Sequence, residues 1–165
     1  MRSLYLIIIS GLLLMVGSCT SAKKSFEKND YNSTINMVVD RISKNKKITD
    51  EDIEFLKLAY LRVVENDKNK ILQLKQNNTG ESWTEVFKIY TNMMQRQDAV
   101  MKIAPIYYSN GESYTPIQYD YNSAREEARE KIAEYHYKEA VQLLNTPSRS
   151  NARLAYNHLD CIFFY

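Results

Sequence analysis

The chain has 165 residues, 44% hydrophobic and 12% aromatic, and its 22 Lys and Arg side chains nearly balance 20 Asp and Glu. A chain of this length can bury one sizeable core, and so small an excess of positive charge excludes the broad basic surface that nucleic-acid-binding proteins carry. Two cysteines are too few for a disulfide framework.

The chain begins with the three parts of a signal peptide. Arg2 makes a short basic start, an almost wholly apolar run follows from Leu4 to Val16, and two small residues close it. This order is typical of secretion signals. The apolar run is shorter than the ~20 residues that a membrane-spanning helix needs. We therefore predict that residues 1–18 are a cleaved leader.

Cys19 stands directly after this leader. The sequence Val16-Gly17-Ser18-Cys19 resembles the lipobox of bacterial lipoproteins, which consists of an aliphatic residue, two small residues and a cysteine. The resemblance implies that the leader is cut before Cys19 and that the Cys19 thiol carries a diacylglycerol. Acyl chains in pairs or threes anchor a protein durably, whereas a single chain does not. The alternative is an ordinary signal peptide with an accidental cysteine.

The residues after the cysteine bear on where the protein is held. Lipoproteins of the inner membrane often carry Asp at the position that Thr20 occupies here. Residues 21–24 lack the acidic run that suggests surface display in some lineages. The resemblance therefore implies a bacterial cell envelope protein anchored in the outer membrane, on its periplasmic face, with residues 19–25 as a lipidated tether.

The remaining residues, 26–165, predict a domain of packed α-helices. Only four glycines and three prolines interrupt the chain, whereas tyrosine occurs thirteen times. Apolar residues recur at helical spacing along residues 26–42, 53–64, 71–74, 86–101, 121–145 and 150–163. The polar stretch Glu65-Asn66-Asp67 predicts a turn that joins two antiparallel helices.

Capping residues predict where helices begin. Pairs with the spacing of an N-cap and its partner are Thr49 with Asp52, Ser82 with Glu85, and Ser123 with Glu126. In such a pair the first side chain accepts a hydrogen bond from an amide of the first turn, and the acidic side chain reaches back. Asp50 could also cap the first of these helices.

Residues 103–119 interrupt the helical pattern. Pro105 and Pro116 flank this insert, and Asn110-Gly111 inside it is a strong hairpin signal because both residues tolerate a positive φ. We predict a short β-hairpin or an ordered loop between helices. Aromatic rings with polar tips suit protein interfaces and sugar rings. The candidate binding residues are therefore Tyr107, Tyr108, Tyr114, Tyr119 and Tyr121, which could equally close the open end of the helical stack.

Two short phrases occur twice. Tyr31-Asn-Ser-Thr34-Ile35 matches Tyr137-Lys-Glu-Ala140-Val141 in residue type, and Lys57-Leu58-Ala59-Tyr60 matches Arg153-Leu154-Ala155-Tyr156. The phrases resemble tetratricopeptide repeats, in which an aromatic residue near the start of the second helix accompanies a small residue packed against the helix before it. The resemblance implies an all-α fold of antiparallel helical hairpins, stacked as a short array, with close helix approaches at Thr34 and Ala140.

The end of the chain is apolar and has no cap. Ile162-Phe163-Phe164-Tyr165 offers no polar outer face, although solenoids normally end in a polar capping element. Either this tail packs back on the preceding helices, or the chain is a truncated version of a longer protein. We expect Cys161 to be a small buried hydrophobe.

No pattern typical of catalysis or metal binding is found. His136 and His158 lie on different predicted helices, and neither has the second His or Cys that a metal site needs at suitable spacing. The acidic and basic residues of 125–134 alternate at helical spacing and predict surface ion pairs. We therefore expect no enzyme, no metal and no cofactor.

These predictions together indicate a membrane-anchored, non-enzymatic bacterial lipoprotein that acts as a protein–protein interaction or scaffold module in the envelope. Its partner would be an unidentified envelope protein or peptide. The alternative is a glycan-binding envelope lipoprotein that uses the tyrosines of residues 103–121.

Overall fold

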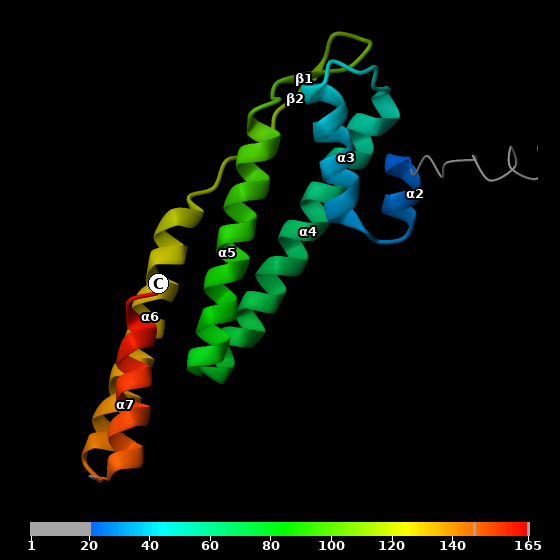
Figure 1. Ribbon diagram of the computed structural model, residues 1–165. Helices are drawn as coiled ribbons and strands as arrows, with labels where there is room; N and C mark the ends of the chain where they lie inside the picture. Colours follow the sequence, from blue (N-terminus) through cyan, green and yellow to red (C-terminus); the bar gives the residue numbers. More distant parts are fainter. Residues whose placement is uncertain (1–20, 147, 165) are drawn as a thin grey trace, which may run out of the picture.

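The computed structural model describes residues 21–146 and 148–164, and it is all-α with a small β-hairpin, as predicted (Figure 1). Its helices in chain order are α2 (Ala22–Glu27), α3 (Tyr31–Ser43), α4 (Asp50–Asn77), α5 (Gly80–Met101), α6 (Tyr121–Leu144) and α7 (Arg149–Ile162). Strands β1 (Ile106–Tyr107) and β2 (Ser113–Tyr114) pair antiparallel between α5 and α6. The predicted leader 1–18 and Cys19 lie outside the described residues.

The helices pack mainly on their neighbours in the chain. α4 and α5 form a long antiparallel pair, α2 and α3 lie against one end of α4, and the β-hairpin lies at that same end (Figure 1). α6 packs on α5, and α7 folds back along α6. No helix in the described part of the chain is both long enough and apolar enough to cross a membrane.

The core runs along the molecule as the buried stripes of successive helices. α3, α4, α5 and α6 each contribute fully buried aliphatic side chains, among them Ile35, Ile53, Leu56, Met93 and Ile132. Burying a side chain of this size stabilises the fold by about 2 kcal/mol. Helices that expose polar residues on their other sides become stable through this packing rather than through propensity alone.

α4 is continuous, and the predicted turn at Glu65-Asn66-Asp67 is wrong. The inward stripe of α4 passes from Val64 to Ile71 through Asp67, which forms an ion pair of 2.9 Å with Arg96 of α5. A charged residue on an inward position breaks the apolar pattern without breaking the helix. The polarity of this stretch therefore marks a paired charge and not a chain reversal.

Two of the three predicted helix starts lie one turn too late. The Thr49–Asp52 capping box is confirmed at the start of α4. α5, however, is capped by Thr79, with Ser82 as the reciprocal partner. α6 is capped by Asp120, whose carboxylate accepts hydrogen bonds from the backbone amides of Asn122 and Ser123. In both helices the predicted serine lies inside the first turn.

The folded domain begins earlier than predicted, because residues 22–25 are helical rather than part of a tether. Ala22 is completely buried and Ser25 nearly so, both against neighbouring helices. The Phe26 ring lies 5.3 Å from the ring of Phe55 in α4, which holds α2 in place. Asp30 caps α3, so the predicted single helix over residues 26–42 is two helices.

The repeated phrases are only partly equivalent in the fold. Thr34 and Ala140 are both buried, as expected at close helix approaches. Tyr31 opens α3, whereas Tyr137 lies in the middle of α6 with 60% of its surface exposed. Phe163 and Phe164 of the apolar tail do not pack back on the preceding helices, since they are 87% and 79% exposed. Cys161 is half-buried rather than buried.

Candidate functional site

The β-hairpin is held firmly to the start of α4. Its turn has Gly111 at φ 88°, while Asn110 keeps a negative φ. The Ser109 amide and hydroxyl both donate to the Asp50 carboxylate, at 2.8 and 3.0 Å. The Tyr108 hydroxyl donates to Glu54 at 2.6 Å. These three hydrogen bonds attach the insert to the first turns of α4.

The five predicted tyrosines separate into two groups. Tyr107 is exposed on β1, and Tyr108 is occupied by its hydrogen bond to Glu54. Tyr114 and Tyr119 instead line a hollow beside α4, and the ring of Tyr121 lies 5.7 Å from the ring of Tyr119. The structure thus brings three of the candidates together and leaves two outside.

An apolar groove, which we call the α4 groove, lies between α4 and the chain segment after the β-hairpin. Its volume is about 220 Å³. Leu61 and Ile117 stand on its two walls and remain 56% and 69% exposed, so they are available to a partner. The lining comprises Lys57, Tyr60, Leu61, Val64, Tyr114, Thr115, Pro116, Ile117 and Tyr119.

The outer wall of the α4 groove is fixed to α5. The buried Gln97 side chain donates to the Tyr119 carbonyl at 3.0 Å and accepts from the Tyr119 amide at 2.8 Å. The Lys68 ammonium lies 4.7 Å from the centre of the Tyr119 ring, within range of a cation–π contact. A wall held at its backbone in this way keeps the groove open without a ligand.

The floor of the α4 groove is aromatic and uncharged at neutral pH. Burial raises the pKa of Tyr114 to about 12, and the neighbouring Tyr60 and Glu54 add to this shift. Burial also shifts the pKa of Tyr60 upward, and it raises to about 12 the pKa of Tyr121, which lies outside the lining and against Tyr119. The hydroxyls of Tyr60 and Tyr121 are buried and find no hydrogen-bond partner among the described residues. Such a lining can bind apolar groups, but it offers no acid or base that titrates near neutrality.

Two other hollows on the described surface have mainly polar linings. One is lined by Asn78, Lys131, Glu134 and Lys138 together with two aromatic residues. Another is lined mainly by asparagine, glutamine and Arg96. The α4 groove differs from both, because its walls consist largely of aliphatic and aromatic side chains.

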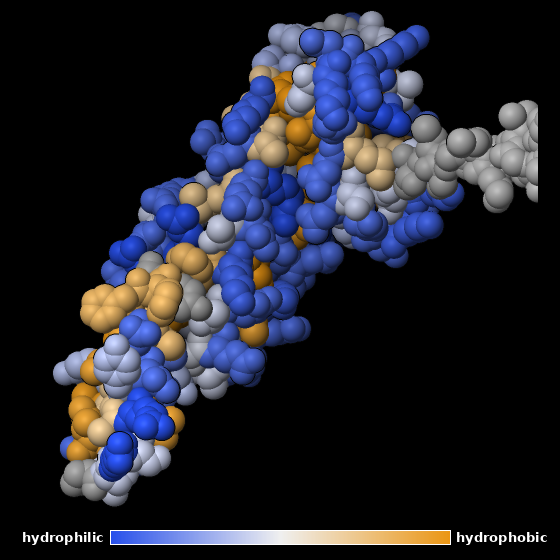
Figure 2. Space-filling view, in the orientation of Figure 1, coloured by the Kyte–Doolittle hydropathy of each residue, from blue (hydrophilic) through white to orange (hydrophobic). Residues whose placement is uncertain are grey.

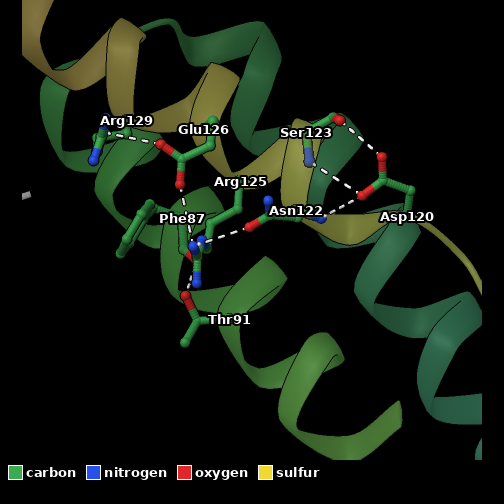
Figure 3. A network of polar contacts seen from close by, with 8 residues as sticks. All are labelled: Phe87, Thr91, Asp120, Asn122, Ser123, Arg125, Glu126 and Arg129. Atoms are coloured by element: carbon green, nitrogen blue, oxygen red, sulfur yellow. Dashed lines mark hydrogen bonds and ion pairs between the residues drawn. The ribbon is translucent and has the colours of Figure 1, made fainter. Parts of the chain in front are cut away.

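The charged start of α6 is a structural network. Arg125 reaches from α6 toward Phe87 and Thr91 of α5, and its guanidinium lies 5.8 Å from the centre of the Phe87 ring (Figure 3). Glu126 pairs with Arg125 and with Arg129, both at 3.1 Å. These are ion pairs along a helix surface, as predicted.

Sequence reasoning missed the contact between the two histidines. The Nδ1 atoms of His136 in α6 and His158 in α7 lie 2.9 Å apart. Each is eleven residues from Pro147, so folding the chain back at this proline would have placed them opposite each other. No group of three or more His, Cys, Asp or Glu residues in residues 21–146 and 148–164 could hold a metal ion.

The chain was compared with protein-family models, with curated proteins and with solved structures. None of the three comparisons found a match. The function is therefore argued from the α4 groove itself.

Proposed function

We propose that the chain is a lipid-anchored bacterial envelope lipoprotein whose helical domain binds a protein or peptide partner in the α4 groove, without catalysing a reaction. The observation that carries this proposal is the apolar lining of the groove, with exposed Leu61 and Ile117 on opposite walls. An apolar side chain of a partner placed between them would be shielded from water on both of its faces. Clusters of this kind, with aromatic residues at the centre, carry most of the affinity of protein interfaces.

The groove suits a peptide better than a glycan. A sugar needs several hydrogen-bonding groups around each ring, whereas Lys57 and Thr115 are the non-aromatic polar residues of the lining. The aliphatic part of the lining comprises Leu61, Val64, Pro116 and Ile117. Of the exposed tyrosines, Tyr107 stands outside the groove. The glycan alternative therefore has few polar contacts with which to fix a sugar in place.

The lipid anchor rests on the resemblance of residues 16–19 to a lipobox. Because α2 begins at Ala22, the span from Cys19 to the first helix would be at most ~10 Å. A lipid on Cys19 would then hold the domain against the membrane, with α2 nearest to it.

The groove is tested by capture of an envelope partner with the full chain from solubilised membranes. We expect Leu61→Asp and Ile117→Asp to abolish capture, because a carboxylate in the groove would have to lose its hydration. Leu72→Asp is the matched control, since Leu72 is an exposed leucine of the same helix outside the groove. Capture that survives both groove variants would contradict the proposal. Retention on purified peptidoglycan or polysaccharide that the groove variants abolish would favour the glycan alternative.

The anchor is tested separately. Cys19→Ala should prevent incorporation of labelled palmitate and move the protein from the membrane pellet to the soluble fraction. A variant that still incorporates the label would show that the lipid is not on Cys19.

A further inference from the structure

The α6–α7 hairpin leaves a set of apolar side chains uncovered, at a distance from the α4 groove. The hairpin extends past the turn between α4 and α5, and hydrophobic side chains are exposed at this end of the molecule (Figures 1 and 2). Contiguous exposed apolar residues mark an interface more often than a plain surface. The residues concerned are Tyr137, Val141 and Leu144 of α6 and Tyr156, Leu159 and Phe163 of α7 and its C-cap.

α7 is held by few buried contacts. Ala155 is the one residue of α7 that is fully buried, and His158 and Ile162 beside it are half-buried. A strongly amphipathic helix that buries so little leaves most of its apolar side without a neighbour in the described part of the chain. The hairpin therefore presents an apolar side that another pair of helices could cover.

The uncovered side chains have the spacing of a packing seam. Residues 137, 141 and 144 follow the pattern i, i+4, i+7, and residues 156, 159 and 163 follow i, i+3, i+7. Ala140 of α6 and Ala155 of α7 are buried, and they show which side of each helix faces the other helix. On both helices the centre of the seam lies about 70° further round the helix axis than that side, counted in chain direction at ~100° per residue. Because the helices are antiparallel, these equal rotations turn both seams to the same side of the hairpin.

The charges beside the α7 seam are arranged for pairing with themselves. Arg153 lies one turn before Tyr156 and Asp160 one turn after it, along the same edge. Neither side chain has an ion-pair partner within the described residues. Arg149 lies one turn before Arg153, so the first half of α7 is basic along this edge. When two copies of α7 are laid antiparallel and cross between Tyr156 and Asn157, Arg153 of each copy stands opposite Asp160 of the other. Flanking charges of this kind set the orientation of paired helices.

We propose that the α6–α7 hairpin pairs with the same face of a second copy of this chain, about a twofold axis, to form a four-helix bundle. The two α7 helices lie antiparallel at its centre, and each Arg153 faces the Asp160 of the other copy. A twofold interface uses the same patch on both copies, so each contact is made twice. This surface is separate from the α4 groove, and the inference does not rest on the proposed function.

The oligomeric state tests the inference. The full chain, in a mild detergent matched to the density of the solvent, should sediment at equilibrium as a dimer. Tyr156→Glu or Phe163→Glu should leave only monomer, whereas Leu154→Glu should not, because Leu154 is an exposed leucine on the opposite side of α7. Helix content measured by circular dichroism identifies any variant that fails to fold.

A charge exchange makes the test specific for the antiparallel pairing. Arg153→Asp should weaken the dimer by about tenfold because each copy then sets two carboxylates opposite each other. The double variant Arg153→Asp/Asp160→Arg should restore the affinity. A chain that is monomeric at all concentrations, or a dimer that Arg153→Asp does not weaken or that the double variant does not restore, would overturn the inference.

Discussion

Gly80, the first residue of α5, shows how closely α5 and α6 approach each other. A Cβ atom at this position would overlap the Cδ1 and Cε1 edge of the Tyr135 ring, so the ring would have to move. We expect Gly80→Ala to lower the free energy of unfolding by about 1–3 kcal/mol, although alanine favours a helix more than glycine does. Urea unfolding followed by circular dichroism measures the change.

Tyr135 provides the control for this prediction. If the overlap is the cause, Tyr135→Ala should remove the cost of the alanine, so that Gly80→Ala costs nothing further in that background. An equal cost in both backgrounds would show that the effect of the alanine does not come from the contact with Tyr135.

The ion pair between Asp67 and Arg96 also acts at the scale of single residues. Both side chains are mostly buried, and the Arg96 guanidinium also donates to Asn32 of α3 at 3.1 Å. Removing one partner leaves a buried charge unpaired, so Asp67→Ala should destabilise the protein by about 3 kcal/mol. Asp67→Leu together with Arg96→Met should recover most of this loss, because a buried ion pair can often be replaced by packed apolar side chains. Thermal unfolding of the single and double variants measures both effects. A double variant that is less stable than Asp67→Ala would show that the two residues are not strongly coupled.

At the scale of elements, the continuity of α4 joins the two ends of the molecule. A proline inside a helix removes a hydrogen bond and clashes with the preceding turn. Asn66→Pro should therefore cost about 3 kcal/mol or more, whereas a proline in a turn between two helices would be tolerated. Chemical denaturation measures the cost, and an Asn66→Ala variant controls for the loss of the amide. A neutral Asn66→Pro would mean that the chain does turn at this residue.

Which elements form could be predicted from the sequence, because each buried stripe repeats at the helical period and the Asn110-Gly111 turn is local. What the sequence alone could not show is which distant residue compensates a local irregularity. Asp67 looked like a break because Arg96, its partner, is 29 residues away. Asp120 was missed as a cap because Ser123, inside the first turn, fitted the expected spacing equally well.

Only one wall of the candidate site was predicted, for the same reason. Tyr114 and Tyr119 belong to the segment that the sequence singled out, and they do line the α4 groove. Tyr60 and Leu61 form the opposite wall, but their apolar pattern indicated only a core-facing helix. No local signal shows that the segment after the β-hairpin returns to α4, since that approach depends on the contact of Gln97 with the Tyr119 backbone.

At the scale of the whole molecule, the histidine pair makes the α6–α7 hairpin sensitive to acid. Burial lowers the pKa of His136 below its usual value of 6.5, and the nearby His158 lowers it further, although Glu139 opposes the shift. A histidine whose pKa is lowered by folding takes up a proton more readily when unfolded, so stability is lost as the pH falls through that usual value. We expect unfolding near this hairpin to become easier between about pH 7 and pH 5.

Hydrogen exchange of the α6 and α7 amides measures this pH dependence. His136→Gln should flatten it, because glutamine keeps a polar contact to His158 without titrating. The amides of α3 and α4 serve as an internal control, since neither helix contacts the pair. A slope that persists in the glutamine variant would assign the effect to other groups.

The nearest-neighbour order of the helices also bears on how such a chain can change. α7 packs on α6 and α6 on α5, whereas the groove is lined by α4 and by the chain from β2 to Tyr119. Remodelling of the α6–α7 hairpin would therefore leave the groove intact. Descendants of one ancestral chain could therefore exchange their self-association while keeping their ligand, or the reverse. The α4 groove and the α6–α7 hairpin are free to diverge at separate rates.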